Sequence, residues 1–196
     1  MRLELKVVDH FLPPQFFKKL SEYCTTLEYG NDLRLKYSSD KKNYSDIEDS
    51  HFFYSNAIQE DDNLLKDLEK SIIKHFNMRI KNLNLAAFTL VNTKKPRPHR
   101  DRLLFPNEQH LLIYLNGEPS LNSGTGFYEF KDGNYILNTA VGYYPNRGLL
   151  FKADECFHSP LLYSQESNTP RFSIIIWFEP EKEKENNNNN EERLNV

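Results

Sequence analysis

From residue 82 onward, short runs of β-forming residues alternate with turn residues, and this pattern constrains the fold more than any other feature of the sequence. We expect strands at residues 85–91, 110–115, 126–130, 135–137, 148–151 and 172–178. Half a dozen short strands in succession predict an antiparallel sandwich or barrel.

Two amphipathic segments come before these strands. The first follows a predicted strand at residues 3–8 and has apolar residues at helical spacing, namely Phe16, Phe17, Leu20 and Tyr23. The second spans residues 61–76, and its acidic residues suit the N-terminal end of a helix. We therefore expect a mainly β fold with flanking helices on one side.

The C-terminal residues 179–196 differ in composition from the rest of the chain. They include six acidic residues, three basic residues and five consecutive asparagines, and cannot bury enough apolar surface to fold. We expect a disordered polar tail here. A chain of 196 residues favours one domain, so residues 1–178 should form a single unit with a helix-rich part (1–80) and a β core (82–178).

The tail also accounts for the whole formal net charge of −3, which leaves the body of the chain neutral. Nucleic-acid-binding proteins usually carry a basic excess, so a nucleic-acid partner is not expected. No apolar run approaches the roughly 18 residues of a membrane span, and the first residues lack a signal peptide. Cys24 and Cys156 should be small buried hydrophobes. These features predict a soluble cytoplasmic protein.

One segment is long and polar without a strand or helix pattern. Residues 36–50 are rich in Ser, Asp, Lys and Tyr. Such a segment is either a solvated linker or an active-site lid, and the sequence leaves both open.

Two histidines and an aspartate could form a metal site. His99 and Asp101 are two residues apart, so in an extended segment both side chains point the same way and can share one ion. His158 follows an apolar run, where rigid structure can place it beside the other two. Two histidines and one carboxylate leave three positions of an iron(II) octahedron open. The alternative is a surface histidine beside an exposed aspartate.

Arg171 begins the last predicted strand and alternates with Ser173, Ile175 and Trp177 on one face. A buried strand that is apolar on both faces has no favourable place for a guanidinium unless an anion meets it. A carboxylate held bidentately is the natural partner, and Ser173 can add a hydroxyl donor. The alternative is that Arg171 is merely the solvated first residue of the strand.

With these motifs the sequence resembles the 2-oxoglutarate- and iron(II)-dependent oxygenases, and within them the prolyl-hydroxylase-like branch. The resemblance covers residues 85–178, and residues 7–12 are similar to the usual entry strand and helix. It implies a double-stranded β-helix, or jelly roll, with the site inside its open end. The metal ligands it implies for iron(II) are His99, Asp101 and His158, with no further catalytic residue.

The resemblance also implies how the co-substrate is held. Residues 171–173 match the strand that grips the C5 carboxylate of 2-oxoglutarate, through Arg171 and Ser173. Residues 110–116 resemble the core strand whose tyrosine, here Tyr114, hydrogen-bonds the same carboxylate. Residues 124–128 look like the glycine-bearing turn into a strand.

Two departures from the family bear on the substrate. Residues 92–98 lack the glycine- and tyrosine-rich lead-in that is common among prolyl hydroxylases. Residues 171–175 do not reproduce the longer arginine- and asparagine-bearing signature of the nucleic-acid demethylase branch. The expected reaction is therefore hydroxylation of a protein or peptide side chain, or of a small molecule, rather than of an alkylated base.

Two other functions remain open from the sequence. A cupin-like binding module would hold metal without turnover, because jelly rolls host many functions. A zinc hydrolase would use the same three ligands plus water, with Glu155 or Glu129 as base.

A basic cluster surrounds the His-x-Asp motif. It is either solvated surface or a patch that attracts an anionic substrate, and it consists of Lys94, Lys95, Arg97, Arg100 and Arg102.

Overall fold

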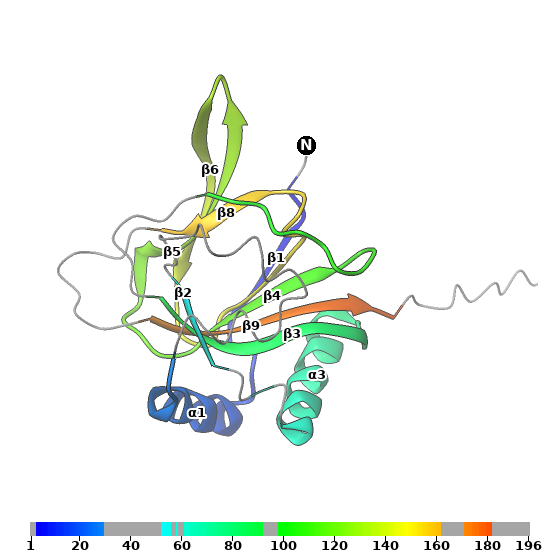
Figure 1. The fold of residues 1–196 in the computed structure, drawn as a ribbon. Helices are drawn as coiled ribbons and strands as arrows, with labels where there is room; N and C mark the ends of the chain where they lie inside the picture. The colour runs from blue at the N-terminus through cyan, green and yellow to red at the C-terminus, as the bar shows by residue number, and fades with distance from the viewer. Residues whose placement is uncertain are drawn as a thin grey trace, which may run out of the picture.

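A computed structural model describes residues 3–29, 52–55, 58, 61–91, 98–161 and 171–181 of the chain. These residues form a mainly antiparallel β structure with two helices below the larger sheet (Figure 1). The larger sheet has six strands in the order β1-β7-β4-β9-β3-β2, and the smaller has three in the order β6-β5-β8. This is the jelly roll with flanking helices that the sequence predicts.

The larger sheet contains β1 (Leu5–Val8), β2 (Phe52–Ser55), β3 (Ile80–Val91), β4 (Gln109–Tyr114), β7 (Gly148–Phe151) and β9 (Arg171–Pro180). The smaller sheet contains β5 (Ser120–Lys131), β6 (Asn134–Tyr143) and β8 (Phe157–Pro160). The helical segments are α1 (Pro14–Tyr23), the short 3₁₀ turn η1 (Cys24–Thr26) and α3 (Asp62–Phe76).

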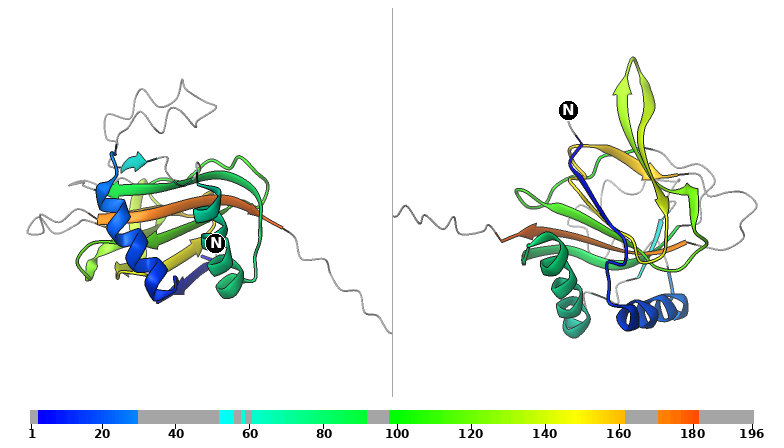
Figure 2. Two further views of the ribbon diagram at one scale, coloured as in Figure 1. Left: turned by 90° about the horizontal axis from the view of Figure 1, so that it is seen from below. Right: turned by 180° about the vertical axis from the view of Figure 1, so that it is seen from behind.

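The helices lie against the face of the larger sheet that points away from the smaller sheet (Figure 2). Asp61 caps α3, because its Oδ1 accepts hydrogen bonds from the backbone N–H groups of Asn63 and Leu64 at 3.1 and 2.9 Å. The helix ends at Asn77, which adopts a left-handed conformation with φ 56°. Both helices bury apolar side chains in one cluster with the sheet, among them Leu20, Leu68, Ile72 and Phe76.

Strand β9 divides its side chains between two environments, as its alternation predicts. Ile174, Ile176 and Phe178 belong to the core cluster between the larger sheet and the helices. Ile175 and Trp177 belong to a separate cluster on the opposite face. A strand buried on both faces fixes its register strongly, because a slip of one residue would exchange the two sets.

A second core fills the space between the two sheets. Phe127 of β5 packs edge-on against Phe151 of β7, with ring centroids 5.0 Å apart. Tyr114 and Tyr143 belong to the same cluster and their ring centroids are 4.5 Å apart. This interior is where inward-facing polar side chains of both sheets can meet.

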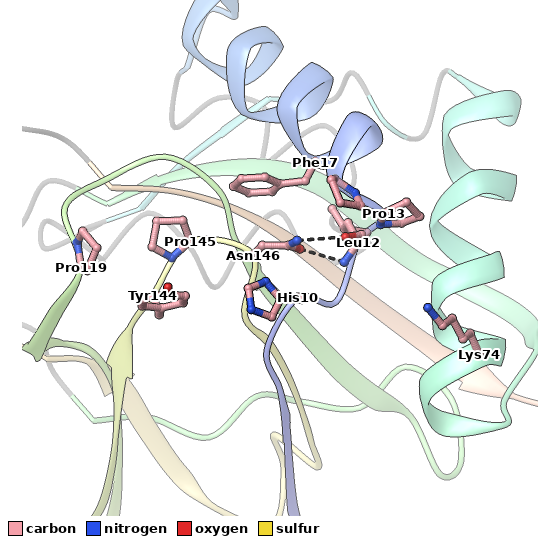
Figure 3. A pocket seen from close by; sticks show the side chains of 10 residues that line it. His10, Leu12, Pro13, Phe17, Lys74, Pro119, Tyr144, Pro145 and Asn146 are labelled. Atoms are coloured by element: carbon pink, nitrogen blue, oxygen red, sulfur yellow. Dashed lines mark hydrogen bonds between the residues drawn. The ribbon is translucent and has the colours of Figure 1, made fainter.

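The junction between β1 and α1 is pinned by Asn146, which has a left-handed φ of 63°. Its Oδ1 accepts a hydrogen bond from the N–H of Leu12 at 2.8 Å, and its Nδ2 donates to the carbonyl of Leu12 at 2.9 Å (Figure 3). A pocket of about 510 Å³ adjoins this junction and is lined in part by Phe17, Lys74 and Tyr144 (Figure 3). None of the predicted metal or co-substrate residues lines it.

Several boundaries differ from the sequence prediction. The paired strands β5 and β6 are much longer than residues 126–130 and 135–137, because most of the added residues, 120–125 and 138–143, are polar or small and show no apolar alternation, although several of them are buried. Strands β2 and β8 were not predicted at all. Residues 124–128 lie within β5 and form no turn. Gly124 is needed instead for close strand approach, since a Cβ there would collide with the carbonyl of Val141.

Some predictions fall outside the described residues. They concern the lid or linker at residues 36–50, the basic residues Lys94, Lys95 and Arg97, and nearly all of the tail. Glu179 and Pro180, assigned to the tail from sequence, are the end of β9. Cys24 and Cys156 are both buried and free, as predicted. In the part of the chain that is described, no helix has the length and apolar character to cross a membrane.

Candidate metal centre

Backbone pairing brings His99, Asp101 and His158 to one place. The N–H of His99 donates to the carbonyl of His158 at 3.0 Å, and the N–H of His158 donates to the carbonyl of His99 at 2.8 Å. This isolated bridge adds the His99 segment beside β8 of the smaller sheet. The N–H of Asp101 donates to the carbonyl of Ala153 at 3.0 Å, which fixes the second residue of the motif.

The side chains of these residues converge. One potential ligand atom from each residue lies within 4.8 Å of the other two. His99 Nε2 is 3.5 Å from Asp101 Oδ1, and His158 Nε2 is 3.7 Å from Asp101 Oδ2. Two imidazole nitrogens and one carboxylate are a donor set that suits divalent iron, with open positions for other ligands.

The electrostatics of the cluster favour the ligand forms of Asp101 and His158. Burial lowers the pKa of His158 to about 3, although Asp101 acts in the other direction. Burial would raise the pKa of Asp101, but the attraction of His158 and the proximity of His110 and His99 hold that pKa below its ordinary value. An ionised carboxylate beside neutral imidazoles is the state that binds a metal ion. Asp101 Oδ2 is buried without a hydrogen-bond partner among the described residues, as suits an oxygen close to a metal-binding position.

A third histidine, His110, lies beside this cluster and was not singled out from the sequence. Its Nδ1 is 3.4 Å from Asp101 Oδ2, and the residue is only 4% exposed. Burial lowers the pKa of His110, so its imidazole is neutral at ordinary pH. The sequence signal that could have identified His110 is its position as a polar residue on the inward face of the predicted strand 110–115.

The residues predicted to hold the co-substrate form a second polar group. Arg171 is 2% exposed, which excludes the alternative that it is solvated. Its Nη1 donates to the carbonyl of Gly124 at 2.8 Å, and its guanidinium carbon lies 5.9 Å from the ring centre of Tyr114. Ser173 is also buried and pairs directly with Tyr114 across β9 and β4.

Two further residues belong to this group and were missed from the sequence. Thr125 shares a hydrogen bond of 2.7 Å with the hydroxyl of Tyr114, and burial raises the pKa of that tyrosine, so its phenol stays protonated. The ring of Tyr143 lies 5.5 Å from the guanidinium carbon of Arg171. Neither residue stands out in the sequence, because both lie in parts of β5 and β6 that the predicted strands did not include.

The register of the larger sheet orders its inner face in rows. His110 pairs with Phe151 and Trp177, Leu112 pairs with Leu149 and Ile175, and Tyr114 pairs with Ser173. Side chains two residues apart on a strand are separated by about 6.6 Å, so the His110 and Tyr114 rows are about 13 Å apart. An apolar row therefore separates the polar group at Arg171 from the cluster at Asp101.

The glutamates considered as a hydrolase base lie apart from these contacts. Glu155 Oε1 is 3.0 Å from Lys152 Nζ in a partly exposed ion pair. Glu129 is exposed on β5. Of the basic cluster, Arg100 and Arg102 are both exposed, and the guanidinium carbon of Arg100 lies 4.3 Å from the ring centre of Phe157.

Comparison with known proteins agrees on the fold. No protein-family model matches this sequence, and no curated protein matches it. Among solved structures, a prolyl-4-hydroxylase of Pseudomonas putida is 17% identical, with a TM-score of 0.52 and 91% of this chain and 93% of that chain covered. The non-heme alpha-ketoglutarate-dependent epimerase SnoN from nogalamycin biosynthesis is 14% identical, with a TM-score of 0.63 and coverage of 91% and 78%.

A third similar structure is a prolyl hydroxylase from Trichoplax adhaerens in complex with a peptide fragment of a hypoxia-inducible-factor oxygen degradation domain. It is 14% identical, with a TM-score of 0.55, and the match covers 89% of this chain and 82% of that chain. At such identities the likeness concerns the fold. The chain thus has the fold of the prolyl-hydroxylase-like 2-oxoglutarate- and iron(II)-dependent oxygenases.

Proposed function

We propose that the protein is an iron(II)- and 2-oxoglutarate-dependent dioxygenase. His99, Asp101 and His158 would hold iron(II), and Arg171 with Ser173 and Tyr114 would hold the C5 carboxylate of 2-oxoglutarate. One observation carries the proposal: a His-Asp-His cluster and a buried arginine face the same interior between the two sheets, separated by an apolar row. A five-carbon dicarboxylate has one anionic end for each polar group.

The arginine end suits a carboxylate for physical reasons. Arg171 is buried, so its charge is poorly solvated and a bound anion would gain strongly from it. The hydroxyls of Tyr114 and Ser173 lie on the same face and can donate to the carboxylate oxygens. Leu112 and Ile175 would pack on the carbon chain and exclude water from it.

The metal end would be open on one side only. The side chain of His99 is 40% exposed, whereas those of Asp101 and His158 are 15% and 8% exposed. A substrate would therefore approach from the His99 side. Bound iron and 2-oxoglutarate would supply the oxidising chemistry, while this chain orients both groups and shields them.

For the substrate we propose a protein or peptide side chain, or a small molecule, which becomes hydroxylated. Both classes occur among the similar structures, since one prolyl hydroxylase is in complex with a peptide fragment and SnoN belongs to nogalamycin biosynthesis. The exposed Arg100 and Arg102 next to the metal ligands favour a substrate with negative charge.

An anaerobic titration tests the proposal without a known substrate. Iron(II) followed by 2-oxoglutarate should produce the weak visible charge-transfer band of the chelate in the wild-type protein and not in His158→Ala. His10→Asn is a matched control, because His10 is exposed, lies in the pocket lining far along the chain from the cluster, and has a left-handed φ of 54° that Asn tolerates. Iron binding without the band would favour a cupin-like binding module instead.

A further inference from the structure

His110 is enclosed by aromatic rings at the metal end of the interior. Its ring centroid lies 4.5 Å from that of Phe151 and 5.3 Å from that of Trp177. His158 packs edge-on against it, with centroids 5.6 Å apart and the planes at 80°. These contacts hold the imidazole in one orientation, so its two nitrogens have fixed directions.

The polar atoms of His110 are the unusual feature of this environment. Neither ring nitrogen has a hydrogen-bond partner among the described residues, and Asp101 Oδ2 has none either. His110 Nδ1 and Asp101 Oδ2 nevertheless face each other at 3.4 Å. A charge-assisted hydrogen bond is typically about 2.7–2.9 Å long, so a small shift would pair two buried groups that otherwise stay unsatisfied.

We propose that His110 is a positioning residue for the metal centre, whose Nδ1–H donates to Asp101 Oδ2 and leaves Oδ1 to the metal. This inference rests on the proposed metal site. Oδ1 lies 3.5 Å from His99 Nε2, whereas Oδ2 lies 3.4 Å from His110 Nδ1 and 3.7 Å from His158 Nε2, so Oδ2 is the carboxylate oxygen that His110 can reach. Partners of this kind fix the orientation of a ligating carboxylate and tune its affinity for the metal.

The same strand would then support both ends of the proposed site. His110 and Tyr114 lie four residues apart on the inner face of β4. One contacts the metal-ligating aspartate and the other lies beside Arg171. Strand β4 therefore links the two ends of the proposed site, because it carries one supporting residue for each end.

Two variants of the full-length chain separate this role from the alternatives. His110→Asn places an amide Nδ2 where the imidazole Nδ1 was, so the donor is retained. His110→Leu fills a similar volume and has no donor. Leu85→Val is a matched control, because Leu85 pairs with Trp177 in the same row and has only a packing role.

The measurement is cobalt(II) binding to the metal-free protein, followed by visible absorption, with the melting temperature recorded for each variant. His110→Leu should weaken cobalt(II) binding about 10- to 100-fold. His110→Asn and Leu85→Val should bind close to wild type and keep its spectrum. This pattern would not arise from a general loss of packing, which would affect Leu85→Val as well.

Two results would overturn the inference. If His110→Leu binds cobalt(II) as tightly as wild type, His110 only fills space. If His110→Asn is as weak as His110→Leu and both spectra change, His110 is itself a ligand. A wild-type protein that binds no cobalt(II) would instead refute the proposed function.

Discussion

Replacing Arg171 with alanine should weaken 2-oxoglutarate binding and leave metal binding in place. Arg171 lies beside Tyr114, and the apolar row of Leu112 and Ile175 separates it from the metal cluster. It therefore has no direct part in holding the metal ion. The variant removes the only charge among the three proposed co-substrate residues. Its effect should therefore appear in the co-substrate constant alone.

The magnitude follows from the burial of the guanidinium. Arg171 is 2% exposed, so water cannot take over its hydrogen bonds to a bound carboxylate. A charge-assisted hydrogen bond contributes about 1.5–3 kcal/mol, which corresponds to roughly a 10- to 150-fold change in Kd. Ser173→Ala removes a neutral donor from the same face and should cost about 0.5–1.5 kcal/mol, roughly 2- to 13-fold.

The assay is an anaerobic titration of the iron(II)-loaded variants with 2-oxoglutarate. The weak visible band reports the chelate, and iron(II) affinity is measured separately. Arg171→Lys belongs in the series, because it keeps the charge and loses the two-pronged geometry, and should fall between wild type and Arg171→Ala. Melting temperatures show how much the lost contact to Gly124 destabilises each protein.

Three outcomes would contradict the proposed role of Arg171. An unchanged 2-oxoglutarate constant in Arg171→Ala would place the co-substrate carboxylate elsewhere. Iron(II) binding that weakens in parallel with 2-oxoglutarate binding would make Arg171 a structural residue. A larger effect of Ser173→Ala than of Arg171→Ala would contradict the role of the buried charge.

Three other predictions concern the metal, the substrate and the fold. Replacing a proposed metal ligand with alanine, at His99, Asp101 or His158, should abolish succinate formation while the circular dichroism spectrum remains native. Near-normal turnover in one of these variants would remove its residue from the site. The kcat/KM of an anionic substrate should fall from low to high salt, because charge attraction is screened over about 8 Å at physiological salt. Replacing Lys94, Lys95 and Arg97 with glutamine should flatten this salt dependence. An unchanged salt dependence would mean that the three residues are only solvated surface. Asn146→Ala should lower the free energy of unfolding by about 3 kcal/mol, because it removes the side-chain partners of both backbone groups of the buried Leu12 and puts alanine at φ 63°. Urea unfolding measures this change, and a loss below about 1 kcal/mol would contradict the prediction.

Much of the larger sheet could be predicted, because burial leaves a clear signal in the sequence. The alternation from Arg171 to Trp177 correctly separates the inner and outer faces of β9. The start of α3 was also correct, since Asp61 is a favourable N-cap. In both cases the local sequence and the final environment agree.

The smaller sheet was less predictable, because pairing determines it more than composition does. Strand β8 is four residues long and ends in Pro160, so nothing in its own sequence indicates a strand. It exists because it pairs with Thr125–Tyr128 of β5. His110 escaped notice for a related reason: its importance arises from the position of Asp101, which becomes its neighbour only in the folded chain.

The apolar core between the larger sheet and the helices contributes to the candidate site without touching it. The inner row of Tyr114 and Ser173 depends on the register between β4 and β9. A slip of one residue would turn Ser173 toward the helices and bring Ile174 to the interior. Packing of Ile174 and Ile176 in the core between the sheet and the two helices opposes that slip, because the slip would put the serine hydroxyl into an apolar core. The helices therefore stabilise the spacing between the proposed metal and co-substrate positions from the opposite face of the sheet.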